Sequence, residues 1–203
     1  MEGNAEIRVD ECVIILAAGE ARRFGSPKQL AMIDGTPMIR RVCETALASE
    51  AANVIVVLGP HAAAIAATIH DLPVHQVINE NWSAGIGSSL KLGLEHQIDR
   101  FPQTKTTAIM LADQPLIDAD HISQLLSTTA IAATSYGRDF GVPAAFNSAF
   151  FPQLLALNHE HGAKSVIAAN LQNTTLIESP CGAFDVDTPA DLDRLRNFIV
   201  TKS

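Results

Sequence analysis

Cysteine is scarce in this chain of 203 residues, and its three copies, Cys12, Cys43 and Cys181, lie far apart. No two of them form a Cys-x-x-Cys pair, so neither a zinc site nor a disulfide framework is indicated, and we expect reduced core thiols. Aromatic residues are also few, with one tryptophan and one tyrosine. The apolar fraction still reaches 47%, with alanine, isoleucine and leucine prominent, and this composition favours an α/β protein over a β-sandwich.

Basic residues are outnumbered, with 14 Lys and Arg against 22 Asp and Glu and a net charge of -8. Nucleic-acid surfaces need a basic stripe, so this balance argues against nucleic acid as a partner. The chain lacks an apolar run of the roughly 20 residues that span a membrane. Its acidic residues 1–6 also lack the cationic region of a signal peptide. We therefore expect no membrane association and a cytoplasmic location, with anionic ligands held by local cations.

Strand and helix patterns alternate along the chain, which predicts a mostly parallel sheet with helices on both faces. Strands are expected over residues 13–16, 53–58, 74–78, 108–111, 131–134 and 174–177, with a sheet-edge segment over 143–146. Helices are expected over residues 38–48, 61–70, 118–127, 148–157, 163–170 and 190–198, with one more that ends near 97. We predict one α/β domain over residues 11–200, a Rossmann-like three-layer sandwich, after an N-terminal tail over 1–10.

Two local predictions accompany this order of elements. Thr36 as N-cap and Pro37 as first helical residue are expected to begin the helix over 38–48. Residues 136–141, Tyr-Gly-Arg-Asp-Phe-Gly, form the most loop-like stretch of the chain.

The chain is organised around the stretch 16–28, which follows the apolar run 13–15 without a break. A continuous β-branched run is typical of a strand buried on both faces. Ala17, Ala18 and Gly19 then remove side-chain bulk where the backbone leaves the sheet. A ligand can therefore approach the main-chain N–H groups closely.

Fixed cations follow this corner, namely Arg22, Arg23 and Lys28, with Gly25 between them. Small residues beside cations suit a triphosphate, whose charge must be met by donors that replace water. The stretch matches neither a Walker loop nor a Gly-x-Gly-x-x-Gly dinucleotide motif. The alternative interpretation is an ordinary tight turn with solvated charges.

The same stretch resembles the signature Leu-Ala-Ala-Gly-x-Ser-x-Arg-Met-Gly-x-x-Lys of the MobA-like NTP transferases, which include the molybdenum cofactor cytidylyl- and guanylyltransferases. Arg23, Gly25 and Lys28 fall on its fixed positions, whereas Ala21 replaces the usual serine and Phe24 the usual methionine. The resemblance implies a fold of the nucleotide-diphospho-sugar transferase type. It also implies that Arg23 and Lys28 hold the β- and γ-phosphates and act in catalysis.

Two acidic positions follow predicted strands. Asp113 lies at the carboxyl edge of the sheet, where a carboxylate beside a triphosphate is a natural Mg²⁺ ligand, or it caps the next helix. Asp187 shares one side of a strand with Asp185 and has the same two interpretations. Both segments resemble metal motifs of the family, Leu-Ala-Asp-x-Pro and Asp-x-Asp/Asn-Thr-Pro-Glu-Asp, with Ala190 in place of the glutamate. The resemblance therefore implies that Asp113 and Asp187 hold Mg²⁺, with Asp113 also catalytic.

The segment 79–89 reads in isolation as a serine-capped helix start. It is similar to the family's Asn-Pro-x-Trp-x-x-Gly-Met-Gly-Ser-Ser segment, with Glu80 in place of the proline. In the family this helix start lies against the base and ribose. The nucleotide-binding candidates are therefore Leu16, Ala17, Ala18, Gly19, Arg23, Gly25, Lys28, Gly85, Ser88 and Ser89.

Agreement with the family is weakest in the part expected near the acceptor. The segment 141–146 has Val142 where the family has histidine, and 159–164 only partly follows Gly-Asp-x-Gly-Ala-Arg. His159 and His161 are expected at a helix start, where they would point in different directions, so we expect no zinc site.

The expected function is transfer of a nucleoside monophosphate to a phosphorylated acceptor with release of pyrophosphate. Ala18 favours CTP, because Leu-Ala-Ala-Gly accompanies cytidylyl transfer in the resembling family and Leu-Ala-Gly-Gly guanylyl transfer. Molybdopterin is the favoured acceptor, and a molybdoenzyme or its chaperone is a further partner to consider. The alternatives are another nucleotide or a sugar phosphate, and a non-catalytic nucleotide-binding accessory protein. A dehydrogenase lacks its dinucleotide motif here.

Overall fold

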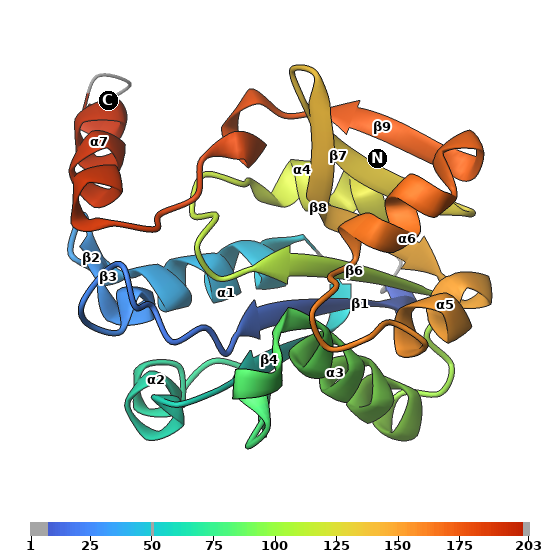
Figure 1. Cartoon of the computed structure of the whole chain (residues 1–203), viewed down its shortest axis with the longest axis horizontal. Coiled ribbons are helices and arrows are strands. Elements are labelled where there is room, and N and C mark those ends of the chain that lie inside the picture. Colours follow the sequence, from blue (N-terminus) through green and yellow to red (C-terminus); the bar gives the residue numbers. More distant parts are fainter. Residues whose placement is uncertain (1–7, 50, 201–203) are drawn as a thin grey trace, which may run out of the picture.

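The computed structural model describes residues 8–49 and 51–200, which form a seven-stranded sheet in the order β5-β4-β1-β6-β8-β7-β9 (Figure 1). Its strands are β1 (Arg8–Ala17), β4 (Ala51–Leu58), β5 (His75–Ile78), β6 (Thr106–Leu111), β7 (Ile131–Tyr136), β8 (Asp139–Asn147) and β9 (Thr174–Glu178). The short strands β2 (Met32–Ile33) and β3 (Thr36–Pro37) pair in a separate hairpin. Strand β1 thus begins three residues before the predicted domain start.

Helices cover both faces of the sheet, which confirms the three-layer α/β prediction (Figure 1). The α-helices are α1 (Met38–Ala48), α2 (Ala62–Thr68), α3 (Ile86–Arg100), α4 (Ala119–Leu126), α5 (Phe151–Leu155), α6 (Lys164–Ala169) and α7 (Pro189–Val200). Short 3₁₀ turns are η1 (Lys28–Leu30), η2 (Trp82–Ala84), η3 (Ser148–Phe150), η4 (Leu171–Asn173) and η5 (Pro180–Ala183).

Strand β1 lies at the centre of the core. Its alternate residues Val13 and Ile15 pack with α1, α2 and α4, whereas Ile14 packs with α3, α5 and α6 on the opposite face. Ile14 and Ile15 are fully buried, and each such side chain stabilises the fold by about 1.5–3 kcal/mol. Because β1 pairs in parallel with β4 and β6, the ends of three neighbouring strands meet at one edge.

Two predictions about the second half of the sheet are wrong. Residues 143–146 do not lie at an edge, because β8 is an interior strand, antiparallel to both β6 and β7. Proline normally marks an edge strand, but Pro143 sits at the register shift between Ala133 and Thr134, where the ladder tolerates it. Residues 136–141 are not a loop but a tight hairpin, with Gly137 at φ +72° in its turn.

Helix boundaries also differ from prediction at two places. Thr36 does not cap α1, since Thr36 and Pro37 form β3 and the helix begins at Met38 with Pro37 as N-cap. The helix expected over 148–157 is divided into η3 and the shorter α5. Cys12, Cys43 and Cys181 are all free thiols, and burial raises the pKa of Cys43 to about 12. Within the described ranges no helix has the length and apolar character needed to cross a membrane.

Candidate active site

A cavity of about 510 Å³ lies at the edge where β1 and β6 end. It is lined by residues of the 16–29 stretch, of the segment 82–89, of the β6 end at 111–113, and by Asp187. Four parts of the chain that are remote in sequence therefore meet there. Open α/β sheets place ligands in this position, beyond the carboxyl ends of their strands.

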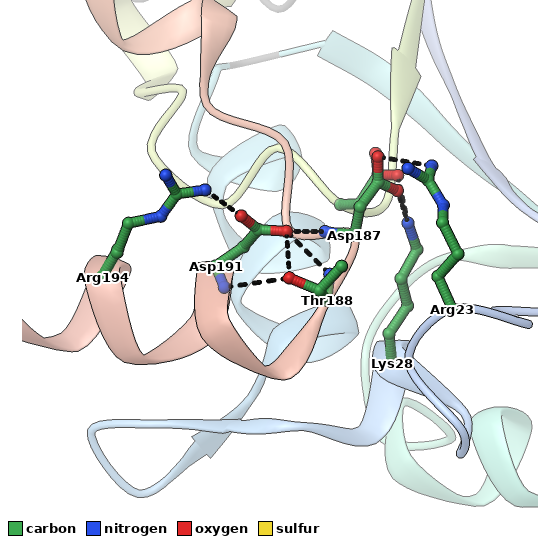
Figure 2. A network of polar contacts seen from close by, with 7 residues as sticks. Arg23, Lys28, Asp187, Thr188, Asp191 and Arg194 are labelled. Atoms are coloured by element: carbon green, nitrogen blue, oxygen red, sulfur yellow. Dashed lines mark hydrogen bonds and ion pairs between the residues drawn. The ribbon is translucent and has the colours of Figure 1, made fainter.

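An ammonium group bridges two carboxylates at the centre of the cavity. Lys28 Nζ lies 2.6 Å from Asp113 Oδ2 and 2.8 Å from Asp187 Oδ1. Arg23 Nη2 contacts the second oxygen of Asp187 at 2.7 Å, and Figure 2 shows Arg23 and Lys28 converging on that carboxylate. The Lys28 and Asp113 side chains are only 12% and 18% exposed, whereas that of Arg23 is 72% exposed.

These contacts set the protonation states. Burial alone would lower the pKa of Lys28, but Asp113 and Asp187 outweigh it and raise that pKa above its usual value. The hydrogen bond from Lys28, aided by Arg23, lowers the pKa of Asp187. Partial desolvation, followed by the charge of Asp113, raises the pKa of neighbouring Asp185 to about 6. At neutral pH the centre therefore holds a charged lysine beside the charged carboxylate of Asp187.

The carboxylate pair fits a divalent cation. Oδ1 of Asp113 is buried and has no hydrogen-bond partner among the described residues, so it remains available to a ligand. Mg²⁺ is commonly held by one or two carboxylates together with substrate phosphates and water. Within the described part of the chain no group of three or more His, Cys, Asp or Glu residues could hold a metal. A cation on Asp113 and Asp187 would therefore complete its coordination with ligand oxygens.

The capping roles considered for the two aspartates belong to other residues. Asp118 caps α4 by accepting a hydrogen bond from the His121 N–H at 2.8 Å. Asp191 Oδ2 accepts from both the N–H and the hydroxyl of Thr188 at 2.7 Å, ahead of α7 (Figure 2). Asp113 and Asp187 are thus left free to face Lys28.

The nucleotide-binding candidates divide into two groups. Those that line the cavity are Leu16, Ala18, Gly19, Arg23, Lys28, Gly85 and Ser89. The other three, Ala17, Gly25 and Ser88, do not line it. Ala17 is buried in β1, and Gly25 adopts φ +78° in a turn closed by its N–H on the Ala21 carbonyl.

The start of α3 is shaped by a network behind the cavity wall. The Asn79 side-chain amide donates to the hydroxyls of Ser88 and Ser89, each at 2.9 Å, and Ser88 donates onward to the Gly85 carbonyl at 2.7 Å. Ser88 is therefore a structural residue at the start of α3, but the serine-capped interpretation is wrong, because the N-cap is Gly85 and no side chain caps the helix. Ser89 takes part in the same network and also reaches the cavity.

Gly85 and Gly87 are required by a close approach of the chain. The Gly87 N–H donates to the His159 carbonyl at 2.8 Å, and a Cβ at Gly85 would lie 2.3 Å from that oxygen. Gly85 also adopts φ +123°. The segment 158–161 thus rests on the start of α3. His159 and His161 lie in this segment before α6 rather than on a helix.

Sequence reasoning missed several residues of the cavity wall, Gln29 and Trp82 among them. Gln29 is buried beside Lys28, and its amide donates to two carbonyls of the corner. Trp82, the sole tryptophan of the chain, also lines the cavity. Both lie inside segments that the motifs had marked, but neither residue type alone indicates a phosphate or metal site.

The sheet order, the glycine corner and the carboxylate pair define an α/β protein with a charged cavity at its strand ends. The family model for the MobA-like NTP transferase domain matches residues 13–174. The chain belongs to this family of nucleotidyltransferases.

Known relatives span most of the chain. It is 31% identical to nicotine blue oxidoreductase of Paenarthrobacter nicotinovorans, over 72% of this chain and 67% of that protein. It is 27% identical to the purine catabolism protein PucB of Bacillus subtilis, over 90% and 94% of the two chains.

Solved structures agree with the fold. The crystal structure of a Mycobacterium tuberculosis Rv0371c homologue from Mycobacterium sp. strain JC1 superposes with a TM-score of 0.83 at 27% identity, covering 97% of this chain and 100% of that one. The Rv0371c complex with manganese from M. tuberculosis H37Rv has a TM-score of 0.78 at 23% identity, covering 93% and 98%. This second likeness extends to the fold alone.

Proposed function

We propose that the protein transfers CMP from CTP to molybdopterin, releasing pyrophosphate, with Mg²⁺ held by Asp113 and Asp187. The observation that carries this proposal is the Lys28 ammonium group, within 2.8 Å of both carboxylates and inside one cavity with the corner. Phosphoryl-type transfer depends on positioning and charge rather than on covalent chemistry. The cavity supplies cations, carboxylates and small residues.

Four charged residues of the cavity have roles in the proposed reaction. Arg23 and Lys28 hold the β- and γ-phosphates, and the N–H groups of the corner add donors toward the leaving pyrophosphate. Asp113 and Asp187 place the cation, which when bound offsets negative charge on the α-phosphate. The attacking phosphate of the acceptor is already ionised, so the protein needs no general base.

A divalent cation has independent support. The buried Asp113 Oδ1 lacks a partner among the described residues, and the structural neighbour Rv0371c was crystallised with manganese. CTP is favoured by Ala18 in the corner, and molybdopterin by the likeness of 79–89 to the cytidylyltransferase branch. Delivery of the product to a molybdoenzyme or its chaperone would follow.

One relative points to a different class of reaction. Nicotine blue oxidoreductase carries the name of a redox enzyme, so membership of the family does not by itself fix the chemistry. The carboxylate pair favours metal-assisted transfer, because Mg²⁺ is commonly held by one or two carboxylates together with phosphate oxygens.

The test is a pyrophosphate-release assay of the purified protein with Mg²⁺ and each of the four nucleoside triphosphates. Acceptors are molybdopterin and, as a control, a sugar phosphate. We expect release only with CTP and molybdopterin. Preference for GTP or for the sugar phosphate would redirect the assignment within the family. Nucleotide binding without release would favour a non-catalytic accessory protein.

A further inference from the structure

Gln29 makes a contact with the corner that no motif predicts. The residue is 2% exposed, and its Nε2 donates to the Ala17 carbonyl at 3.0 Å and to the Gly19 carbonyl at 2.9 Å. One side chain thus ties two peptide groups of the corner, on either side of Ala18. Gln29 lies in η1 directly after Lys28, so a single turn serves both the corner and the carboxylates.

The orientation of this amide follows from its neighbours. Both N–H bonds of Nε2 have a carbonyl to meet, whereas a flipped amide would set its oxygen against two oxygens. The Gln29 Oε1 atom is buried without a hydrogen-bond partner among the described residues. The side chain therefore forgoes an acceptor bond while it holds the corner.

Fixing these carbonyls also fixes the N–H groups that follow them. In a trans peptide the carbonyl and the next N–H point in opposite directions, and the peptides here are trans. The N–H groups of Ala18 and Glu20 are therefore turned away from Gln29. Neither donates to a backbone carbonyl within residues 8–49 and 51–200, and both residues line the cavity.

We propose that Gln29 is a positioning residue that aims the N–H groups of Ala18 and Glu20 at the polyphosphate of the nucleotide. This role rests on the proposed function, because it needs a nucleoside triphosphate in the cavity. Gln29 acts through the backbone, so its contribution should grow with the number of phosphates on the ligand.

The test compares Gln29→Met with Gln97→Met. Gln97 is 1% exposed, accepts a hydrogen bond from Thr107 at 2.9 Å and does not line the cavity, which makes it a matched buried glutamine. Affinities for CTP and CMP are read from the fluorescence of Trp82, the sole tryptophan, which lies in the cavity wall.

We expect Gln29→Met to weaken CTP binding by about tenfold and CMP binding by about twofold, since two charge-assisted contacts lose their alignment. Gln97→Met should leave both affinities unchanged. Thermal unfolding monitors the fold of each variant. If Gln29→Met does not fold, Gln29→Glu has the same shape and, when ionised, no donor, so it carries the same comparison.

Two results would overturn the role. One is an unchanged ratio of CTP to CMP affinity in the Gln29 variants, which would make the residue structural only. The other is an equal loss in Gln97→Met, which would make the effect one of general stability. Failure of the wild-type protein to bind any nucleoside triphosphate would instead remove the proposed function, and the role of Gln29 with it.

Discussion

We propose that the nucleotide binds at the ends of β1 and β6 and the acceptor near the β7–β8 hairpin, and the ion pairs at these two ends differ in burial. At the ends of β1 and β6, Lys28 and Asp113 are largely buried and joined at 2.6 Å. At the β7–β8 hairpin, Lys164 and Asp139 are joined at 2.7 Å, but their side chains are 54% and 59% exposed. An exposed pair typically contributes only about 0–1 kcal/mol, whereas breaking a buried pair costs several times more. The nucleotide end is therefore built more firmly than the acceptor end.

The likeness to the family divides along the same line. Motif residues Arg23, Lys28, Asp113 and Asp187 meet in one cavity, whereas the hairpin carries Val142 where the family has histidine. A firm nucleotide end can serve many acceptors, because acceptor choice then depends on contacts that cost little to change. We infer that this chain departs from the family pattern in its acceptor rather than in its reaction.

Asp113→Ala should have the largest effect. We expect transfer to fall by at least about 10³-fold, because the cation and Lys28 lose a common partner. CTP affinity, read from Trp82 fluorescence, should change only a few-fold. Asp118→Ala, which removes a helix cap outside the cavity, is the control and should keep full transfer. Near-normal transfer by Asp113→Ala would show that the reaction does not take place at the ends of β1 and β6.

Lys28→Met should come next and exceed Arg23→Met. Lys28 is buried and touches both carboxylates, so we expect a loss of transfer of about 10²-fold, against about tenfold for the exposed Arg23. Without the competing ammonium group, Lys28→Met should also bind Mn²⁺ more tightly in the absence of nucleotide. Electron paramagnetic resonance titration of Mn²⁺ measures this, and weaker binding would contradict it.

Asp185→Asn tests how the carboxyl group next to the Asp113–Asp187 pair changes the stability of the fold with pH. The carboxyl has a pKa of about 6 in the folded protein and 3.8 as its ordinary value, so the folded state binds the proton more tightly. Its contribution to stability is complete below pH 3.8 and is lost as pH rises through 6. In metal-free buffer, Asp185→Asn should raise the melting temperature by about 1–2 °C at pH 7.5, after allowance for solvent contact. The difference in melting temperature should vanish near pH 3.5. A difference that persists at that pH would show that the raised pKa of Asp185 is not its cause.

Lys164→Met should have the smallest effect. It breaks the exposed pair with Asp139 and the contact over the Phe140 ring. We expect a loss of no more than about 1 kcal/mol in unfolding free energy and an unchanged CTP affinity. Chemical denaturation and Trp82 fluorescence check the two quantities. A large loss of unfolding free energy or of CTP affinity in Lys164→Met would contradict the difference between the buried and the exposed ion pair.

Sequence reasoning recovers the features that follow from neighbours along the chain. The corner after β1 and the aspartate after β6 lie at strand ends, so their place at one edge follows from parallel pairing. The prediction that Lys28 and this aspartate belong to one site also needed the positions of the family motifs.

Features that depend on distant pairing were not recoverable. Strand β8 enters the sheet antiparallel, and only the register shift opposite Val142 and Pro143 makes proline acceptable there. The need for glycine at 85 and 87 comes from the carbonyls of 158–161, which no local pattern reveals. The contacts of Gln29 with the carbonyls of Ala17 and Gly19 likewise depend on the folded structure and not on a local sequence pattern.

The bond between Lys28 and Asp187 joins residues that stand 159 positions apart. Almost the whole chain must therefore leave the ribosome before the two can meet. A nascent or proteolytically shortened chain that ends ahead of Asp187 would keep the corner and Asp113 and yet lack one of the two carboxylates that Lys28 contacts. Only a chain that extends through Asp187 can therefore assemble the whole charged centre.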